Sequence, residues 1–309
     1  MLDLLIIGGS AASTAAGIYA ARRGLNFKII TKEFGGEVAT SGEIGNYPGT
    51  GMTDGIKLAD QFKEHLKLYK ADPEEGIEVA KITKQEDGTF AVAAKKDGAD
   101  ISYQAKAVIV ATGVHPRELS IPGEKEFRNK GVSYCTTCDG PLFSGRVTTV
   151  VGGGNSALEA GLMLADIAQK VYVINKNAAF KGDDVLIKNL SLKSKDKVEI
   201  IYEAQTMEII GEQFVTGIKY KDKDGNEKEV KTDGIFVHIG MIPNSGIVPD
   251  NVEKNPFGEI KVNVKCETNI PGLYAAGDVT DVPFKQIVIA AGQGTTATLS
   301  AVEYLNRLQ

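Results

Sequence analysis

The chain has 309 residues, which is longer than one hydrophobic core usually supports, so two domains are expected. With 42% hydrophobic and 24% charged residues, its composition is that of a globular protein and excludes a disordered chain. The net charge of -5 is mild and spread along the sequence, so it leaves no basic surface for nucleic acid or for an acidic membrane.

The N-terminus begins with a short apolar run at residues 1–7, interrupted only by Asp3, that passes directly into glycines. This run lacks the basic lead and the cleavage site of a signal peptide, so a buried strand is expected there. No apolar stretch of the sequence approaches the roughly 20 residues that span a bilayer. We therefore expect a soluble, cytoplasmic protein with no membrane partner.

The glycines after this run predict the first of two β-α-β units. A helix of small residues at 14–23 and a strand at 27–31 follow the glycine turn. A dinucleotide-binding fingerprint has glycine at its first, third and sixth positions, where this turn has Gly8, Ser10 and Ser13. On its own, this partial match is also compatible with a helix start that binds no nucleotide.

The following segments predict core structure rather than chemistry. One helix has hydrophobic and aromatic side chains at helical spacing, typical of a core or subunit-interface face: Leu58, Phe62, His65, Leu66 and Tyr69. Residues 108–113 predict a buried strand that ends in a glycine turn. We interpret His115, after this turn, and His238, in an expected buried strand, as structural because neither belongs to the cysteine motif described next.

Cys135 and Cys138 are separated by two threonines and followed at once by Asp139. A Cys-x-x-Cys pair can alternate between dithiol and disulfide while exchanging two electrons. A zinc site would need two further ligands at metal spacing, but Cys266 and the three histidines are unpaired in sequence, so no metal is expected. A structural disulfide is the other alternative, but such disulfides occur mainly in secreted proteins, and the sequence carries no sign of secretion. We therefore predict a redox centre, with Cys266 as a buried spectator.

A second β-α-β unit follows the cysteines. A strand at 147–151 leads into a glycine turn, a helix to about Gln169 and a strand at 171–174. The fingerprint positions here are Gly152, Gly154 and Ala157, a better match than in the first unit. Because a chance repeat of strand, glycine turn and small-residue helix is improbable, the two copies predict two bound nucleotides.

Residues 272–278 predict a strand that delivers Asp278 to its carboxyl end, where ligands bind in open α/β sheets. Asp278 is a candidate ligand of a ribityl hydroxyl, and a plain turn aspartate is the alternative. The first domain must then resume after the second, with crossings near Arg117 and Ser245 and a charged hairpin at 219–231 in the insert. The expected class is a three-layer α/β protein with two Rossmann-like dinucleotide-binding domains, the second inserted into the first.

Several segments together carry a family likeness. The chain resembles the low-molecular-weight thioredoxin reductases and, more closely, the reductase part of the flavoprotein subunit of alkyl hydroperoxide reductase. That subunit carries an extra N-terminal domain with its own dithiol, whereas this chain starts at the flavin domain, as a free-standing thioredoxin reductase does. The likeness runs nearly end to end, through residues 34–37, 45–49, 111–113, 134–143, 152–160, 236–244, 265–269, 277–278 and 283–287.

The resemblance implies FAD in residues 1–117 and 246–309, a nicotinamide nucleotide in residues 118–245, and a homodimer. It places the following residues at FAD-binding positions: Gly8, Ser10, Ala12, Gly35, Gly36, Glu37, Thr40, Asn46, Ala111, Thr112, Gly113, Gly277, Asp278, Lys285, Gln286 and Ile287. The candidate positions for the nicotinamide nucleotide are Gly152, Gly154, Asn155, Ser156, Ala157, Lys176 and Lys181.

Glu37 departs from the glutamine that the family usually has at this position. An acid beside a flavin that must accept negative charge is expected to lower the flavin midpoint potential. The substitution Glu37→Gln should therefore raise that potential in a reductive titration. An unchanged midpoint potential would refute this hypothesis.

By the same resemblance, Cys138 is the sulfur next to the flavin, Cys135 is the outer thiol that attacks a protein disulfide, and Asp139 protonates the leaving thiolate. If the Cys-x-x-Cys opens a helix, the partial positive charge there favours the reactive thiolate. The implied activity passes electrons from NAD(P)H through FAD and the two cysteines to thioredoxin, or to a thioredoxin-like or glutaredoxin-like protein. The inserted domain would swivel about the two crossings between the two half-reactions.

The family places recognition of the coenzyme 2′-phosphate just after the second strand of the second unit, usually with a His-Arg-Arg run and a later arginine. Residues 175–181 contain no arginine, so the bidentate phosphate contact is absent. Asn175 stands where an NADH enzyme would have a glutamate for the ribose hydroxyls. Lys176 and Lys181 can hold a phosphate as point charges, which favours NADPH over NADH. The alternative is that both lysines are solvated surface residues.

Four other functions stay open from the sequence, one of them an oxidase that shares the flavin core. The flavin could receive electrons from another donor such as ferredoxin, although the intact second glycine turn argues against it. The acceptor could be a peroxiredoxin. A redox-sensing nucleotide-binding module without turnover would show a broken Cys-x-x-Cys or an incomplete glycine turn, and both motifs are whole here.

Overall fold

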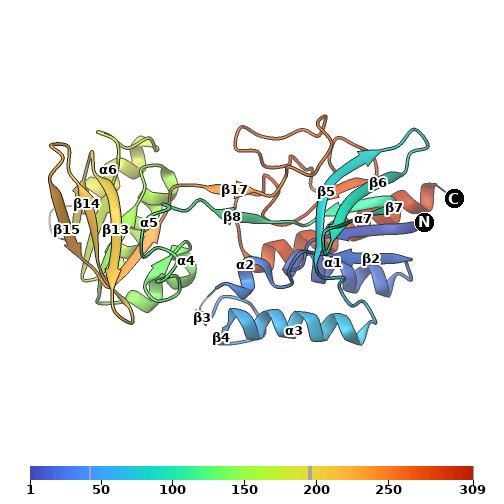
Figure 1. Ribbon diagram of the computed structural model, residues 1–309, viewed down its shortest axis with the longest axis horizontal. Helices are drawn as coiled ribbons and strands as arrows, with labels where there is room; N and C mark the ends of the chain where they lie inside the picture. The colour runs from blue at the N-terminus through green and yellow to red at the C-terminus, as the bar shows by residue number, and fades with distance from the viewer. Residues whose placement is uncertain (42, 194–196, 309) are drawn as a thin grey trace. The chain divides into compact units, whose positions relative to one another are not determined.

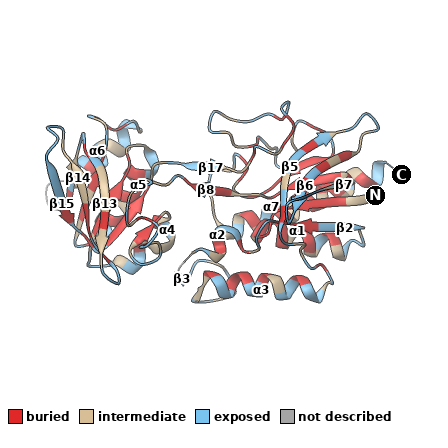
Figure 2. Cartoon of the chain, in the orientation of Figure 1, coloured by how far each residue is buried: buried red, intermediate tan, exposed pale blue. Residues whose placement is uncertain are grey.

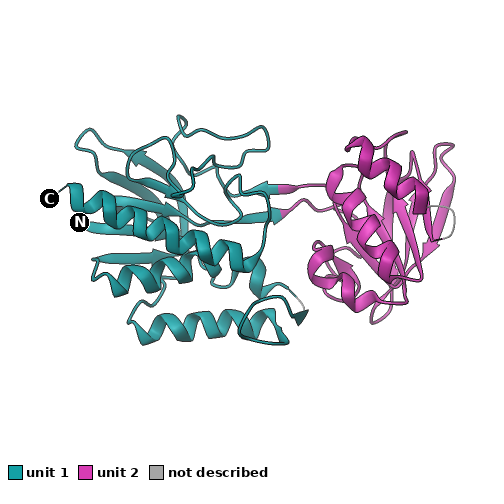
Figure 3. Ribbon diagram, turned by 180° about the vertical axis from the view of Figure 1, so that it is seen from behind, with its two compact units in different colours: residues 1–115, 242–309 teal, residues 116–241 magenta. Residues whose placement is uncertain are grey.

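The computed structural model describes residues 1–41, 43–193 and 197–308, so the end of the expected flavin domain at Gln309 lies outside the described residues. The chain forms two compact units: residues Met1–His115 with Ile242–Gln309, and residues Pro116–Met241 (Figure 3). Within the described ranges, no helix combines the length and the apolar character needed to cross a membrane.

The first unit is built on a mixed sheet. Strand β1 (Leu2–Ile7) pairs in parallel with β2 (Phe27–Ile30) on one side and with β7 (Ala99–Val110) on the other. Strand β18 (Leu273–Ala275) also pairs in parallel with β7, which brings the C-terminal segment next to the N-terminal one. The last four residues of β1 are buried, as expected for a strand covered on both faces. The sheet continues in the antiparallel strands β6 (Phe90–Lys96) and β5 (Ile77–Lys84).

Three layers result in this unit (Figures 1 and 2). Helices α1 (Ala11–Arg22), α3 (Gly55–Leu68) and α7 (Ile287–Arg307) share one core with one face of the sheet, and residues of the β5–β6–β7 meander and of the segment 248–279 form a core on the other face. Helices α1 and α7 pack closely, because a Cβ at Gly294 would meet the Ala12 carbonyl oxygen at 2.0 Å. The short elements of this unit are α2 (Gly36–Ala39), β3 (Glu43–Ile44) and β4 (Thr53–Asp54).

The second unit repeats this layering around a parallel sheet in the order β12-β11-β10-β16-β9. Helices α5 and α6 share a core with one face of the sheet, while an antiparallel sheet of β13, β14 and β15 shares a core with the other. The bounds are β9 (Val132–Ser133), β10 (Val147–Val151), α5 (Asn155–Ile167), β11 (Lys170–Ile174), α6 (Asp184–Lys193), β12 (Val198–Ile201), β13 (Gln205–Gly211), β14 (Val215–Lys221), β15 (Glu227–Lys231) and β16 (Gly234–Val237).

The predicted α/β fold with two Rossmann-like domains is confirmed, with local differences. Strand β7 has 12 residues, not only the buried end that the apolar run predicts, because its first half is partly exposed in the meander and lacks an apolar signature. His238 lies one residue beyond β16 rather than inside a strand, although its N–H still donates to the Val151 carbonyl. The predicted charged hairpin is formed by β14 and β15.

The chain passes between the units twice, at residues 115/116 and 241/242, whereas the sequence suggests crossings near Arg117 and Ser245. The two passages lie in β8 (Val114–Pro116) and β17 (Met241–Pro243), which pair with each other. Asn244 explains why residues after 241 group with the first unit: its N–H donates to the Gly113 carbonyl at 3.0 Å.

Candidate active site

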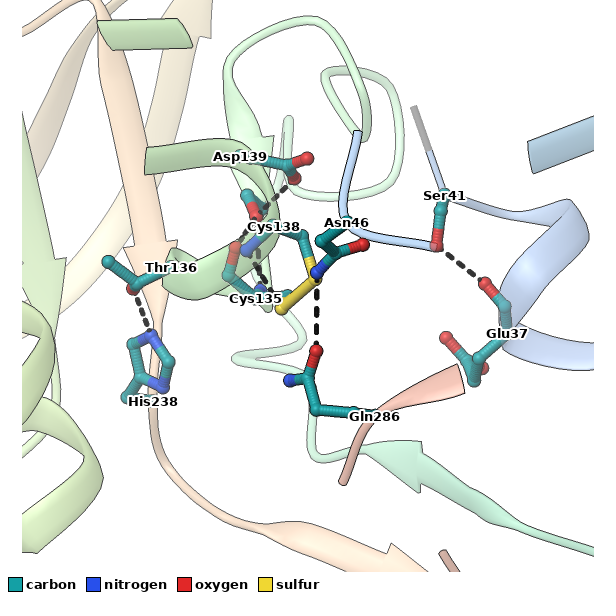
Figure 4. Close-up of a disulfide and its surroundings, with 10 residues drawn as sticks. Glu37, Ser41, Asn46, Cys135, Thr136, Cys138, Asp139, His238 and Gln286 are labelled. Atoms are coloured by element: carbon teal, nitrogen blue, oxygen red, sulfur yellow. Dashed lines mark hydrogen bonds between the residues drawn. A yellow bond between two sulfur atoms is a disulfide. The ribbon is translucent and has the colours of Figure 1, made fainter. Parts of the chain in front are cut away.

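Cys135 and Cys138 are joined by a disulfide (Figure 4). Helix α4 (Thr136–Asp139) begins immediately after Cys135, which caps it, and continues into the 3-10 turn η1 (Gly140–Phe143). The backbone N–H of Cys138 points to the Cys135 sulfur at 3.3 Å. A backbone donor at this distance stabilises negative charge on that sulfur, so the local structure favours a thiolate at Cys135 once the disulfide opens.

Asp139 is held against the disulfide segment by Ser133, the last residue of β9. The Ser133 hydroxyl donates to the Asp139 carboxylate at 2.6 Å and accepts from the Cys135 N–H at 3.1 Å. Burial raises the pKa of Asp139 above its ordinary value, although the bond from Ser133 opposes this. A carboxyl with a raised pKa keeps its proton to higher pH, as a proton donor to sulfur requires. Ser133 was not identified as a site residue from the sequence. Its position two residues before Cys135 is the only feature of the sequence that points to this role.

The second glycine turn leads from β10 into α5. A Cβ at Gly152, where φ is +154°, would lie 2.2 Å from the His238 carbonyl oxygen, so only glycine fits. Beyond its chain neighbours, no described atom lies within 4 Å of a Cβ placed on Gly154, and this open position at the start of an α-helix suits a close approach by a phosphate. Ala157 is buried beneath the turn, while Ser156 is exposed.

Asn155 is engaged within the unit. Its side-chain amide donates to the Asp183 carboxylate at 3.1 Å, and its side-chain oxygen accepts from the Asp183 N–H at 2.8 Å. The structure therefore assigns Asn155 first to holding the segment before α6 against the start of α5. Its expected contact with a coenzyme is a proposal.

The segment after β11 is ordered by Asn175. This fully buried side chain donates to the Ala179 carbonyl at 3.0 Å and accepts from the Asn177 N–H at 3.0 Å. The polar atoms of its side chain are therefore engaged inside its own loop. Lys176 and Lys181 are exposed, and the Lys181 N–H donates to the Gly153 carbonyl at 2.7 Å, which places it beside the glycine turn.

In the first unit, three separate segments meet at the first glycine turn. Gly8 has a φ of +140°, and a Cβ there would lie 2.1 Å from the Ala111 carbonyl oxygen. The Ser10 hydroxyl donates to the Gly35 carbonyl at 2.7 Å, which ties the turn to the start of α2. Glu37 is exposed in α2, and the Thr40 hydroxyl donates to its carbonyl at 3.1 Å. The structure thus gathers these predicted positions at the carboxyl ends of parallel strands.

Asp278 lies three residues beyond the end of β18, at the same end of the sheet. Its Oδ1 is buried and makes no hydrogen bond within the part of the chain that the structure describes. Burial raises the pKa of Asp278 to about 6, Lys285 lowers it and Glu37 adds to the rise. An orphaned buried oxygen is expensive unless a ligand satisfies it, so its position suits a hydroxyl-bearing ligand. Lys285 itself forms an ion pair with Glu259 at 2.9 Å.

The remaining predicted positions lie in the same unit. The Asn46 amide donates to the Gln286 side-chain oxygen at 3.2 Å (Figure 4), and Ile287 is the first residue of α7. A Cβ at Gly277 would meet that of Ala12 at 3.3 Å, so these two residues are in contact range. Thr112 donates its hydroxyl to the Asn244 carbonyl at 2.8 Å. Asn244, which also bonds His115, was not predicted as a site residue, although it ends one of the family-like segments.

A match to a known protein family identifies the family of this chain. A family model described as "Pyridine nucleotide-disulphide oxidoreductase" matches residues 2–294. The chain belongs to the pyridine nucleotide-disulphide oxidoreductase family. Its structure is similar to that of a thioredoxin reductase from Streptococcus pyogenes, with a TM-score of 0.91 and 34% identity over 99% of both chains. The predicted relationship to the low-molecular-weight thioredoxin reductases is confirmed.

Two further relatives of this pyridine nucleotide-disulphide oxidoreductase are longer proteins. An alkyl hydroperoxide reductase subunit of Pseudomonas putida is 43% identical over 99% of this chain and 58% of its own length. A protein named NADH dehydrogenase in Bacillus subtilis is 42% identical over 99% of this chain and 59% of its own length. The chain therefore spans less than two thirds of the length of these curated relatives.

The family implies FAD and NAD(P)H, and the residues of this oxidoreductase fit both groups. The cradle at Gly8 and the orphaned oxygen of Asp278 suit FAD in the first unit, and the open turn at Gly154 suits the nicotinamide nucleotide in the second. Among the residues that the structure describes, no group of three histidine, cysteine, aspartate or glutamate side chains is placed to hold a metal ion.

Proposed function

We propose that this protein is a flavin-dependent disulfide reductase that passes electrons from NAD(P)H through FAD and the Cys135–Cys138 pair to a thioredoxin-like protein. The observation that carries the proposal is the disulfide at the start of α4, with Asp139 held beside it by Ser133 and with its pKa raised. A structural disulfide would need no buried proton donor. The glycine turn at Gly152 in the same unit supports a nicotinamide nucleotide as the electron source.

The chain's own residues account for the sulfur chemistry. When bound, FAD supplies two-electron transfer between a nicotinamide and a disulfide. The Cys135 thiolate then attacks the acceptor disulfide, forming a mixed disulfide and displacing one acceptor thiolate, which takes the proton of Asp139. The Cys138 thiolate attacks the Cys135 sulfur, which restores the Cys135–Cys138 bond and expels the second acceptor sulfur as a thiolate, which takes a proton from solvent. The acceptor gains two electrons and two protons, and the pair returns to the disulfide.

The acceptor is either a thioredoxin-like protein or a peroxiredoxin system. Similarity over 99% of a thioredoxin reductase supports the first, and the alkyl hydroperoxide reductase relatives support the second. A panel of thioredoxin, a glutaredoxin-like protein and a peroxiredoxin, each assayed with NADH and NADPH, tests the proposal. We expect turnover with thioredoxin. Turnover with peroxiredoxin alone would support the second function, and no reduction of any of the three would contradict the proposal.

Two coenzymes remain candidates, each favoured by a different observation. Lys176 and Lys181 are exposed near the second glycine turn, while the buried Asn175 supplies no acid for the ribose hydroxyls, and both facts favour NADPH. The name of the Bacillus subtilis relative favours NADH. An anaerobic titration that follows flavin bleaching with each coenzyme separates them.

The lysines give a sharper prediction for the coenzyme. If Lys176 and Lys181 hold the 2′-phosphate, replacing either with alanine should raise the KM for NADPH by up to about fivefold, because an exposed ion pair contributes at most about 1 kcal/mol. The KM for NADH should stay unchanged, since NADH lacks this phosphate. Steady-state kinetics with both coenzymes checks this. Equal changes in the KM for NADPH and for NADH would mean that the lysines do not bind the 2′-phosphate.

A further inference from the structure

His238 contacts both chemical motifs of the second unit. Its Nε2 lies 2.7 Å from the hydroxyl oxygen of Thr136, the first residue between the two cysteines (Figure 4). Its main chain runs beside the second glycine turn, since its N–H donates to Val151 and its carbonyl leaves no room for a Cβ at Gly152. These contacts join the helix that carries the disulfide to the strand end that carries the glycine turn.

We propose that His238 is a positioning residue of the redox disulfide, which acts by holding Thr136 and with it the first turn of α4. Thr136 is 5% exposed, so its hydroxyl is removed from solvent and depends on this hydrogen bond. The bond spans 102 residues of sequence and anchors a helix of only four residues. So short a helix has little stability of its own, and its geometry depends on such contacts.

The electronic state of His238 suits this role. Burial lowers the pKa of the imidazole to about 4, so the ring is neutral near pH 7. A neutral imidazole can share a hydrogen bond with a hydroxyl without placing a charge beside the sulfurs. His238 thus restrains the turn rather than donating protons, and Asp139 remains the proton donor.

The restraint has a consequence for the sulfur couple. When the disulfide opens, the two sulfurs are free to separate, and a fixed α4 turn keeps them at a distance from which the bond can re-form. Losing the bond to Thr136 should therefore favour the open dithiol. A neutral hydrogen bond contributes about 0.5–1.5 kcal/mol, which corresponds to a shift of roughly two- to tenfold in the dithiol/disulfide equilibrium, or about 10 to 30 mV for two electrons.

The test measures this equilibrium directly in the whole, flavin-loaded protein. Wild type, His238→Ala, Thr136→Val and the double variant are equilibrated in anaerobic glutathione buffers, and the free thiols are alkylated and counted by mass spectrometry. Each single variant should shift the equilibrium two- to tenfold toward the dithiol. The double variant should shift no further than the larger single one, because both remove the same bond.

Two controls separate positioning from general loosening. His238→Gln, whose amide can still bond the Thr136 hydroxyl, should stay within about twofold of wild type, and His65→Ala on α3 should not change the equilibrium. The KM for NAD(P)H of His238→Ala should also stay unchanged, since the main-chain contact with Gly152 remains. No shift in either single variant, a shift toward the disulfide, or additive effects in the double variant would overturn the inference.

The inference rests on the proposed function only in that Cys135 and Cys138 exchange between dithiol and disulfide. The glutathione equilibrium is read without any acceptor protein or turnover. A protein that fails to reduce thioredoxin would refute the proposed function and leave this measurement intact. If His238→Ala does not fold, Thr136→Val and His238→Gln still decide the question, because the first must shift the equilibrium and the second must not.

Discussion

Replacing Cys135 with serine is expected to abolish reduction of a protein disulfide, by on the order of 10³-fold or more, while reduction of the flavin by NAD(P)H continues. A serine hydroxyl is a far weaker nucleophile than a thiolate and cannot form a mixed disulfide with the acceptor. The flavin half-reaction does not use Cys135, because by the family pattern Cys138 is the sulfur next to the flavin. Stopped-flow bleaching with NAD(P)H and a coupled thioredoxin assay measure the two steps separately.

Cys266→Ala is the matched control for this substitution. Cys266 is a buried thiol outside the disulfide, and burial raises its pKa to about 11, so it carries no thiolate at working pH. Both half-reactions should stay at wild-type rates in this variant. Loss of flavin bleaching in Cys135→Ser, or retained reduction of the acceptor, would contradict the roles given to the two cysteines.

The second large effect is expected at Asp278, where Asp278→Asn should weaken FAD binding and stabilise the flavin-free protein. Burial raises the pKa of Asp278 from 3.8 to about 6. Between these two pH values the folded chain holds a proton that the unfolded chain has released, so stability falls as the pH rises through this window. Above about pH 6 the full cost of burying the ionised Asp278 carboxylate is present, on the order of 3 kcal/mol, and a neutral amide avoids this cost.

FAD affinity should fall by about 10- to 100-fold in the same variant, because a hydrogen bond to a charged group contributes about 1.5–3 kcal/mol. Flavin fluorescence gives the dissociation constant, and denaturant unfolding of the flavin-free protein at pH 4 and pH 8 gives the stability. The gain in stability should be present at pH 8 and absent at pH 4. Asp281→Asn, an exposed carboxylate nearby, should change neither quantity. An unchanged FAD affinity would remove Asp278 from the site.

Local sequence patterns were sufficient to predict many of the strands and turns of the fold. The apolar residues 4–7 and the predicted strand at 147–151 lie in β1 and β10, because a strand buried on both faces needs continuous apolar residues. Gly8 and Gly152 mark the turns after them, since a side chain at either position would collide with a neighbouring carbonyl. These requirements act within a few residues, so they can be read from the sequence alone.

Contacts between distant segments could not be predicted from local sequence patterns. His238 was interpreted as a structural residue of a strand, yet it lies beyond β16 and bonds Thr136. Asn175 stands where an NADH enzyme would have a glutamate, but the sequence does not indicate that its side chain is buried in its own loop. In both residues the backbone position follows from the pattern, but the direction of the side chain depends on which segments pack beside it.

By itself, the sequence determined the two glycine turns, the Cys-x-x-Cys pair and the order of the elements, because these depend on local backbone geometry and on hydrophobic periodicity. Only the tertiary structure decided that Ser133 holds Asp139, that His238 holds Thr136, and that an oxygen of Asp278 is buried without a partner among the described residues. Such features arise when folding brings separate strand ends together. The protonation and geometry of the candidate site are therefore consequences of packing, which no single stretch of residues specifies.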